Sequence, residues 1–227
     1  MRKAKISIKI VLRLLKDIGN GTYFRFAWKA KIPMVFGYSL GITQQIMPSP
    51  TFENKVYNLK LASQRISEYV IHPGQVFSFW HIVGNPEKGF KKGRSIINGQ
   101  LCEEMGGGLC QVSGIIYHAA LLGGLEILER HNHSMDIYND ETRFTPLGTD
   151  ATVVYGYKDL RFRNNLCFPV QFSLVVMGNS ISAVLRSEVK IREKALVFEM
   201  EDSGNEIVVT VTDEKGNMLN TSEYKTL

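Results

Sequence analysis

Residues 106–113, Gly-Gly-Gly-Leu-Cys-Gln-Val-Ser, place a cysteine two positions after three glycines and at the start of an apolar segment. Glycine tolerates positive φ values, so the run predicts a sharp backbone turn. The residues that follow, to about Leu122, have the apolar composition of a largely buried helix. A thiol at a helix N-terminus lies near unpaired N–H groups and a partial positive charge, which favour its reactive thiolate form. The stretch therefore predicts a buried helix that begins with a reactive Cys110.

The segments around this helix predict mainly strands. A further helix is expected at residues 54–70. Short strands are expected at 76–80, at 95–97 before the hairpin-turn pair Asn98-Gly99, and at 150–155, 160–162, 170–176 and 181–185. The pattern indicates an α+β fold, a mostly antiparallel sheet with few helices. We expect three parts: a basic amphipathic N-terminal segment and linker (1–50), a main domain (51–187) and a C-terminal β extension (188–227).

The formal net charge of +5 is concentrated at the N-terminus. Residues 4–18 predict a helix with lysines and arginines around an apolar stripe of Ile6, Ile10, Val11, Leu14, Leu15 and Ile18. Such a helix fits an anionic membrane surface, and it equally fits packing against the body through the same stripe. No segment predicts a membrane-spanning helix, and no clear signal peptide is visible, so the location stays open between cytoplasm, peripheral membrane and envelope.

Two histidines, His131 and His133, lie in the loop Arg130–Ser134 and are candidate bases for Cys110. Three interpretations stand on the residues alone. In the first, Cys110 is a nucleophile, and N–H groups of residues 108–111 stabilise the oxyanion that develops on the substrate. In the second, Cys110 binds zinc with both histidines, although no fourth ligand is evident. In the third, the glycines and the cysteine only form a tight turn. In the first interpretation one carboxylate, Asp150 or Asp159, orients the histidine, and an arginine contacts a substrate carboxylate.

The chain has three cysteines, too few and too irregularly spaced for a disulfide framework. Cys102 and Cys167 are expected to be small core residues. No nucleic-acid-binding module and no phosphate-binding loop is present, and we expect no metal and no cofactor.

Four motifs in this order resemble the VanW domain family. They are Pro73–Phe79, the triple glycine with Cys110–Ser113, Arg130–Ser134, and Asp150–Thr152 followed by Asp159–Asn164. The resemblance covers residues 54 to 172, and the chain is similar to the stand-alone VanW-type proteins that occur beside vancomycin B-type resistance genes.

The resemblance implies a role in the bacterial cell envelope, because some VanW-domain proteins are understood to act as L,D-transpeptidases. Such an enzyme forms a thioester with a peptidoglycan stem peptide and passes the acyl group to an amine. The motifs assign the nucleophile to Cys110 and the base to His133, with His131 as second choice and Asp150 as the orienting group. They imply that substrate is contacted by Gly107, Gly108, Gln111, Ser113, Arg130 and Arg161.

Two hypotheses about function follow. The chain is a cysteine acyltransferase of L,D-transpeptidase type that acts on peptidoglycan stem peptides, or it is a non-catalytic accessory protein of glycopeptide resistance or cell-wall metabolism that binds a peptide or precursor.

Overall fold

The computed structural model describes residues 2–30, 34–97, 100–135 and 145–226. The described residues form four α-helices, one short 3-10 helix and thirteen strands, and every pairing between these strands is antiparallel. The expected α+β class with a mostly antiparallel sheet is therefore confirmed. The helices are α1 (Arg2–Gly19), η1 (Tyr23–Arg25), α2 (Phe52–Ser67), α3 (Phe79–Val83) and α4 (Leu109–Leu122).

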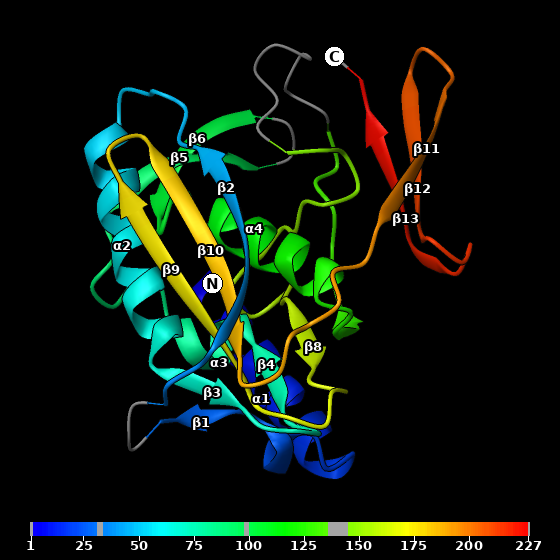
Figure 1. Cartoon of the computed structure of the whole chain (residues 1–227). Coiled ribbons are helices and arrows are strands. Elements are labelled where there is room, and N and C mark those ends of the chain that lie inside the picture. The colour runs from blue at the N-terminus through cyan, green and yellow to red at the C-terminus, as the bar shows by residue number, and fades with distance from the viewer. Residues whose placement is uncertain (1, 31–33, 98–99, 136–144, 227) are drawn as a thin grey trace.

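The strands form four sheets, arranged around α4 (Figure 1). The five-stranded sheet has the order β1 (Trp28–Lys29), β3 (Tyr69–Ile71), β9 (Val170–Met177), β10 (Ser180–Ser187), β2 (Tyr38–Gln45). The three smaller sheets are β4 (Val76–Ser78) with β8 (Arg161–Arg163) and β7 (Glu126–Glu129), β5 (Lys92–Ile97) with β6 (Gln100–Met105), and β11 (Leu196–Asp202) with β12 (Glu206–Asp213) and β13 (Met218–Lys225).

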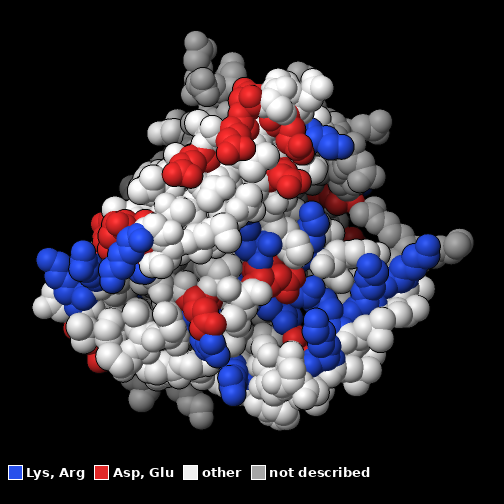
Figure 2. All heavy atoms as spheres, turned by 90° about the vertical axis from the view of Figure 1, so that its right-hand side faces the viewer, with Lys and Arg blue, Asp and Glu red and all other residues white. Residues whose placement is uncertain are grey.

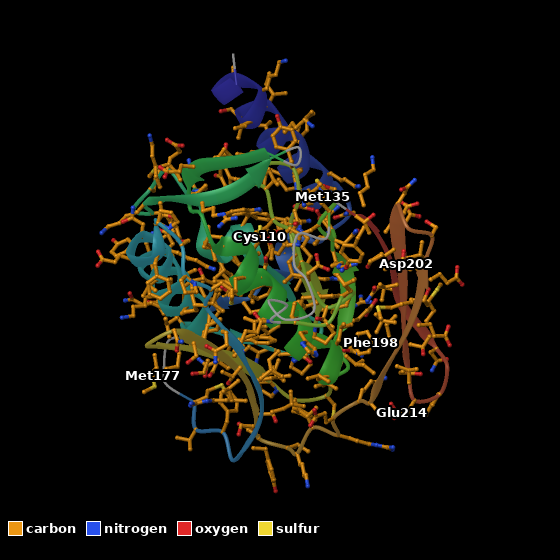
Figure 3. The ribbon with its side chains drawn as sticks, turned by 90° about the horizontal axis from the view of Figure 1, so that it is seen from above. Cys110, Met135, Met177, Phe198, Asp202 and Glu214 are labelled. Atoms are coloured by element: carbon orange, nitrogen blue, oxygen red, sulfur yellow. The ribbon has the colours of Figure 1, made fainter. Side chains whose placement is uncertain are left out.

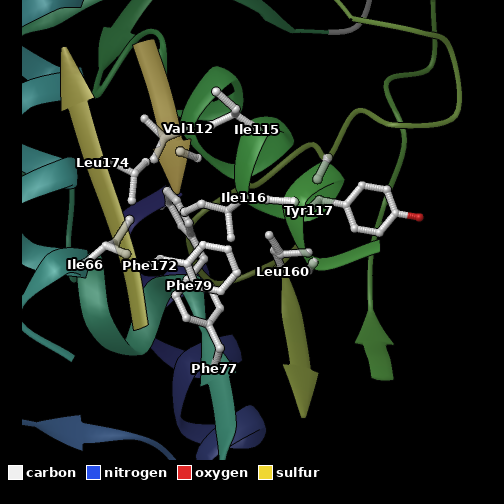
Figure 4. Close-up of a cluster of buried hydrophobic side chains, with 14 of the residues drawn as sticks. Ile66, Phe77, Phe79, Val112, Ile115, Ile116, Tyr117, Leu160, Phe172 and Leu174 are labelled. Atoms are coloured by element: carbon white, nitrogen blue, oxygen red, sulfur yellow. The ribbon is translucent and has the colours of Figure 1, made fainter. Parts of the chain in front are cut away.

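Helix α4 is the centre of the hydrophobic core. Val112, Ile115 and Ile116 have no exposed surface, and helices α2 and α4 contact strands β9 and β10 of the five-stranded sheet (Figure 4). Each apolar side chain of this size contributes about 1.5–3 kcal/mol when fully buried. Phe77 and Phe162, from neighbouring strands, stack with ring centroids 4.5 Å apart. The first turn of α4, which carries Cys110, is therefore fixed to the hydrophobic core.

Some local predictions were wrong. Residues 150–155 form no strand beyond an isolated bridge of Val154 to Lys158. Ala151 and Val153 are buried, and an extended loop packed on a helix alternates in burial as a strand does. The strand predicted at 76–80 ends at Ser78, whose hydroxyl accepts a hydrogen bond from the His81 N–H and begins α3. The hairpin turn expected at residues 98–99 lies outside the described residues.

The N-terminal 50 residues contribute to the main sheet. Strand β2 pairs with β10 along its whole length, from Tyr38 to Gln45. Helix α1 lies against the body through Ile6 and Ile10, which cover Gly156, while the rest of the predicted apolar stripe is exposed. Among the described residues, no helix is long and apolar enough to cross a membrane.

Candidate active site

The three glycines of residues 106–108 form the turn between β6 and α4, and two of them have no room for a side chain. A Cβ on Gly107 would lie 2.2 Å from the carbonyl carbon of Gly93. Gly108 caps the helix with a φ of 97°, and a Cβ there would lie 2.7 Å from Cγ of Lys55. Glycine alone accommodates both the positive φ and the close approach. The turn thus places Cys110 in the first turn of α4.

Cys110 is half-buried, and its Sγ lies 3.8 Å from the carbonyl oxygen of Val153. Burial alone would raise the pKa of this thiol, but a hydrogen bond from His133 and the charge of that ring outweigh it and lower the pKa below 9.0. His133 therefore favours the thiolate form of Cys110 over the thiol.

Asp150 holds His133 from the other side of the ring. His133 Nδ1 lies 2.6 Å from Oδ2 of Asp150, and the His133 backbone N–H donates to the same oxygen at 2.7 Å. Burial lowers the pKa of His133, yet its hydrogen bonds to Asp150 and Cys110 raise it to about 10. Burial likewise raises the pKa of Asp150, but His133 and then the charge of Arg130 lower it to about 2. Since Nδ1 faces Asp150, Nε2 is the nitrogen left for the sulfur.

The second carboxylate oxygen of Asp150 is held by residues far away in the chain. Oδ1 accepts hydrogen bonds from Nη2 of Arg130 at 2.8 Å and from the Tyr224 hydroxyl at 2.5 Å. Arg130 also donates to Ser222 and lies over the ring of Tyr117, 5.1 Å from its centroid. Arg130 thus fixes the carboxylate and is itself buried, with 6% of its side chain exposed.

Gln111 and Ser113, both expected to contact substrate, are buried in the helix packing. Gln111 Nε2 donates to the carbonyl oxygen of Gln45 in β2 at 2.7 Å. The Ser113 hydroxyl donates to the carbonyl oxygen of Ala151 at 2.6 Å and has no exposed surface. These two side chains attach α4 to its neighbours and are not available to a ligand in this structure.

The other two expected site residues lie in a separate charged cluster. His131 Nε2 is 3.1 Å from Oε1 of Glu129. Arg161 donates two hydrogen bonds to Asp17 of α1, at 2.7 and 2.8 Å, and one to Asp159. Because His131 pairs with Glu129, the zinc set of Cys110 with both histidines does not form. Within the described ranges, no group of three or more His, Cys, Asp or Glu side chains is arranged to hold a metal ion.

The N–H groups of residues 108–111 are only partly available to an oxyanion. Leu109 N–H donates to Gly106 O and Gln111 N–H donates to Gly108 O. The N–H groups of Gly108 and Cys110 have no hydrogen-bond partner among the described residues. A helix start with two such donors beside the thiol is suited to an anionic oxygen.

Two residues near the site were not anticipated from the sequence. Tyr224 lies in the C-terminal strand β13, and no local pattern links it to Asp150. Lys55, on α2, lies against Gly108, and its ammonium group makes no ion pair or hydrogen bond with any described residue. Burial and then the charge of Arg94 lower the pKa of Lys55 to about 8.

Cys167, expected in the core, is exposed, and Cys102 is half-buried. Figure 3 shows Cys110 toward the middle of the molecule, with Phe198 and Asp202 on the sheet at its side.

At the start of α4, the pKa of a half-buried thiol is lowered by an imidazole, and this imidazole is hydrogen-bonded to a carboxylate. Cys110, His133 and Asp150 thus form a cysteine–histidine–aspartate arrangement, here called the triad. The sequence model of the VanW-like protein family matches residues 54–186, more than half of the chain, and contains all three triad residues. The chain belongs to the VanW family.

Two relatives are similar over part of their length. Uncharacterized protein YoaR of Bacillus subtilis (strain 168) is 34% identical over 152 residues, 64% of this chain and 48% of that protein. Vancomycin B-type resistance protein VanW of Enterococcus faecalis (strain ATCC 700802 / V583) is 37% identical over 115 residues, 50% of this chain and 42% of that protein. This chain thus matches about half the length of each relative. No solved structure matches.

Proposed function

We propose that this chain is a cysteine acyltransferase of L,D-transpeptidase type that acts on peptidoglycan stem peptides through a thioester. The observation that carries the proposal is the arrangement at the first turn of α4: His133 lowers the pKa of the Cys110 thiol, and its Nδ1 lies 2.6 Å from Oδ2 of Asp150. Membership of the VanW family, and the similarity to a protein named for vancomycin resistance, support a role in the cell envelope.

The residues supply each part of an acyl transfer. The Cys110 thiolate attacks the substrate carbonyl, and the developing oxyanion is stabilised by the N–H groups of Gly108 and Cys110. As the C–N bond breaks, the His133 imidazolium gives its Nε2 proton to the leaving amine, and a thioester remains. The neutral imidazole then takes a proton from the acceptor amine, which attacks the thioester and releases the thiolate. Asp150 keeps the ring oriented in both steps.

Lys55 is the group that we assign to a carboxylate of the stem peptide. The two arginines first considered for this role are occupied: Arg130 binds Asp150 and Arg161 binds Asp17. The Lys55 ammonium has no partner among the described residues and lies beside the glycine turn, two residues before the nucleophile. A bound carboxylate would supply the counter-charge that the described residues do not provide to Lys55.

The direct test is to incubate the full chain with a synthetic stem tetrapeptide and measure its intact mass. An adduct of the acyl fragment on the wild type, absent from Cys110→Ala, is the expected result. Cys102→Ala is the matched control and should keep the adduct, because the Cys102 thiol lies on β6, against the carbonyl oxygen of Ser95. Peptide binding of equal strength by wild type and Cys110→Ala, with no adduct and no released D-alanine, would instead establish the accessory role.

A further inference from the structure

Helix α1 contacts the body through polar side chains as well as through Ile6 and Ile10. Asp17 is 6% exposed and accepts both hydrogen bonds of the Arg161 fork, and Arg13 donates to Glu129 at 2.6 Å. Ile6 and Ile10 complete this contact over Gly156. The four contact residues of α1 are spaced by four, three and four positions, so they form one stripe of the helix.

The opposite side of α1 is an exposed apolar face made of five residues: Ile8, Val11, Leu12, Leu15 and Ile18, with 59%, 53%, 60%, 59% and 43% of their surface exposed. At 3.6 residues per turn they fall within roughly a third of the helix circumference. A surface helix normally turns such a stripe to the core, whereas α1 turns it outward and buries Asp17. A continuous exposed apolar stripe of this kind indicates an interaction surface.

Lysines flank this apolar face on one side. Lys5, Lys9 and Lys16 are exposed and lie between the apolar face and the body, and Lys9 also lies 4.0 Å from the ring centroid of Tyr157. The single acid of the helix, Asp17, is paired with Arg161. Figure 2 shows Lys and Arg gathered toward the lower half of this side of the molecule and Asp and Glu toward its top, where β11–β13 lie. The exposed acids of that sheet include Glu199, Glu201 and Asp202.

We propose that the apolar face of α1 docks in the plane of an anionic lipid bilayer, with the lysine flank at the headgroups. An apolar stripe beside a row of lysines is the pattern of helices that lie in a membrane interface. Long lysine side chains reach the headgroups while their stems lie on apolar surface. The acidic sheet at the far end would be repelled by the same surface, so the charge distribution favours one orientation. Phe24, 70% exposed in the adjacent η1, adds an aromatic group next to the helix.

The test is co-sedimentation of the full chain with vesicles of phosphatidylcholine alone and of phosphatidylcholine with phosphatidylglycerol. We expect binding only to the anionic vesicles, weakened by salt because screening shortens the reach of the charges. Leu12→Asp with Leu15→Asp should reduce the partition coefficient by at least about tenfold. Both positions are exposed, so the fold should be retained. The matched control, Met177→Asp with Met200→Asp, changes residues that are 71% and 65% exposed elsewhere and should bind as the wild type does.

A second pair of variants tests the lysine flank. Lys5→Glu with Lys16→Glu lowers the net charge by four, from +5 to +1, and should reduce binding by about tenfold or more. Lys60→Glu with Lys215→Glu makes the same charge change away from α1 and should cost much less. The proposal would be overturned if the two lysine pairs reduced vesicle binding equally, or if the wild type bound both kinds of vesicle equally. Self-association of the chain that Leu12→Asp with Leu15→Asp abolishes would also overturn it, because the face would then belong to a second copy.

Discussion

Replacing Asp150 with asparagine should destabilise the protein by about 3–5 kcal/mol. The carboxylate accepts four hydrogen bonds: Oδ1 from Arg130 and Tyr224, and Oδ2 from the backbone N–H and Nδ1 of His133. In either orientation of the asparagine amide, its NH₂ group takes the place of an oxygen that accepts two hydrogen bonds in the wild type. Two bonds are therefore lost, and each bond to a charged group is worth about 1.5–3 kcal/mol. Arg130, 6% exposed, also loses the charge that offsets its burial.

The loss should depend on pH in a defined way. The pKa of Asp150 is lowered from 3.8 to about 2, so its contribution is present above pH 3.8 and is lost as the pH falls through about 2. The pKa of His133 is raised from 6.5 to about 10, so its contribution is fully present below pH 6.5 and is lost as the pH rises through about 10. The difference between wild type and Asp150→Asn should be largest between these limits, from pH 3.8 to 6.5, and should shrink toward pH 10.

Urea unfolding of both proteins, inside this window and near pH 10, measures the difference directly. The control is Asp202→Asn, an exposed turn carboxylate that accepts one hydrogen bond from Gly204 N–H, which an asparagine oxygen also accepts. Its effect should stay within about 0.5 kcal/mol. A change below about 1 kcal/mol for Asp150→Asn, or a larger change with no pH dependence, would show that Asp150 does not hold a charged His133.

Three further predictions concern the same site. Alkylation of Cys110 by iodoacetamide at pH 7 should slow by about tenfold or more in His133→Ala, because burial then raises the thiol pKa against the hydrogen bond to Val153 alone; an unchanged rate would disprove the ion pair. Tyr224→Phe should lower the free energy of unfolding by about 1–2 kcal/mol, since it removes the hydroxyl between Asp150 and the Gly148 N–H, and calorimetry should show no loss if that contact is unimportant. Gly107→Ala should destabilise by more than about 3 kcal/mol, as its Cβ meets the Gly93 backbone, whereas Gly37→Ala, with open space around it, should stay near zero in the same denaturation assay.

The parts of the site that could be predicted from the sequence are those with a local signal. Three adjacent glycines and an apolar segment predict the turn and helix that present Cys110, and the structure has them at residues 106–122. His133 and Asp150 were assigned from the motifs of the family resemblance, and in the structure His133 lowers the pKa of the thiol and is hydrogen-bonded to Asp150. Arg130 and Arg161 illustrate what a sequence leaves open. An arginine fork binds any carboxylate that the fold brings to it, and here these are Asp150 and Asp17, 20 and 144 positions away.

Both flanks of the family domain contribute to the loop that carries His133. The family match ends at residue 186, yet Tyr224 and Ser222 of β13 bind Asp150 and Arg130. On the other side, Arg13 of α1 binds Glu129, the residue before Arg130. Residues 129–133 therefore connect α1 to the triad through consecutive positions of one short segment. If α1 lies on a bilayer as proposed, the same short segment, residues 129–133, joins the membrane-bound helix to His133 of the triad. Vesicle binding should then slow hydrogen exchange of the amides in residues 129–133. Unchanged exchange there would show that membrane binding by α1 has no effect on the segment that carries His133.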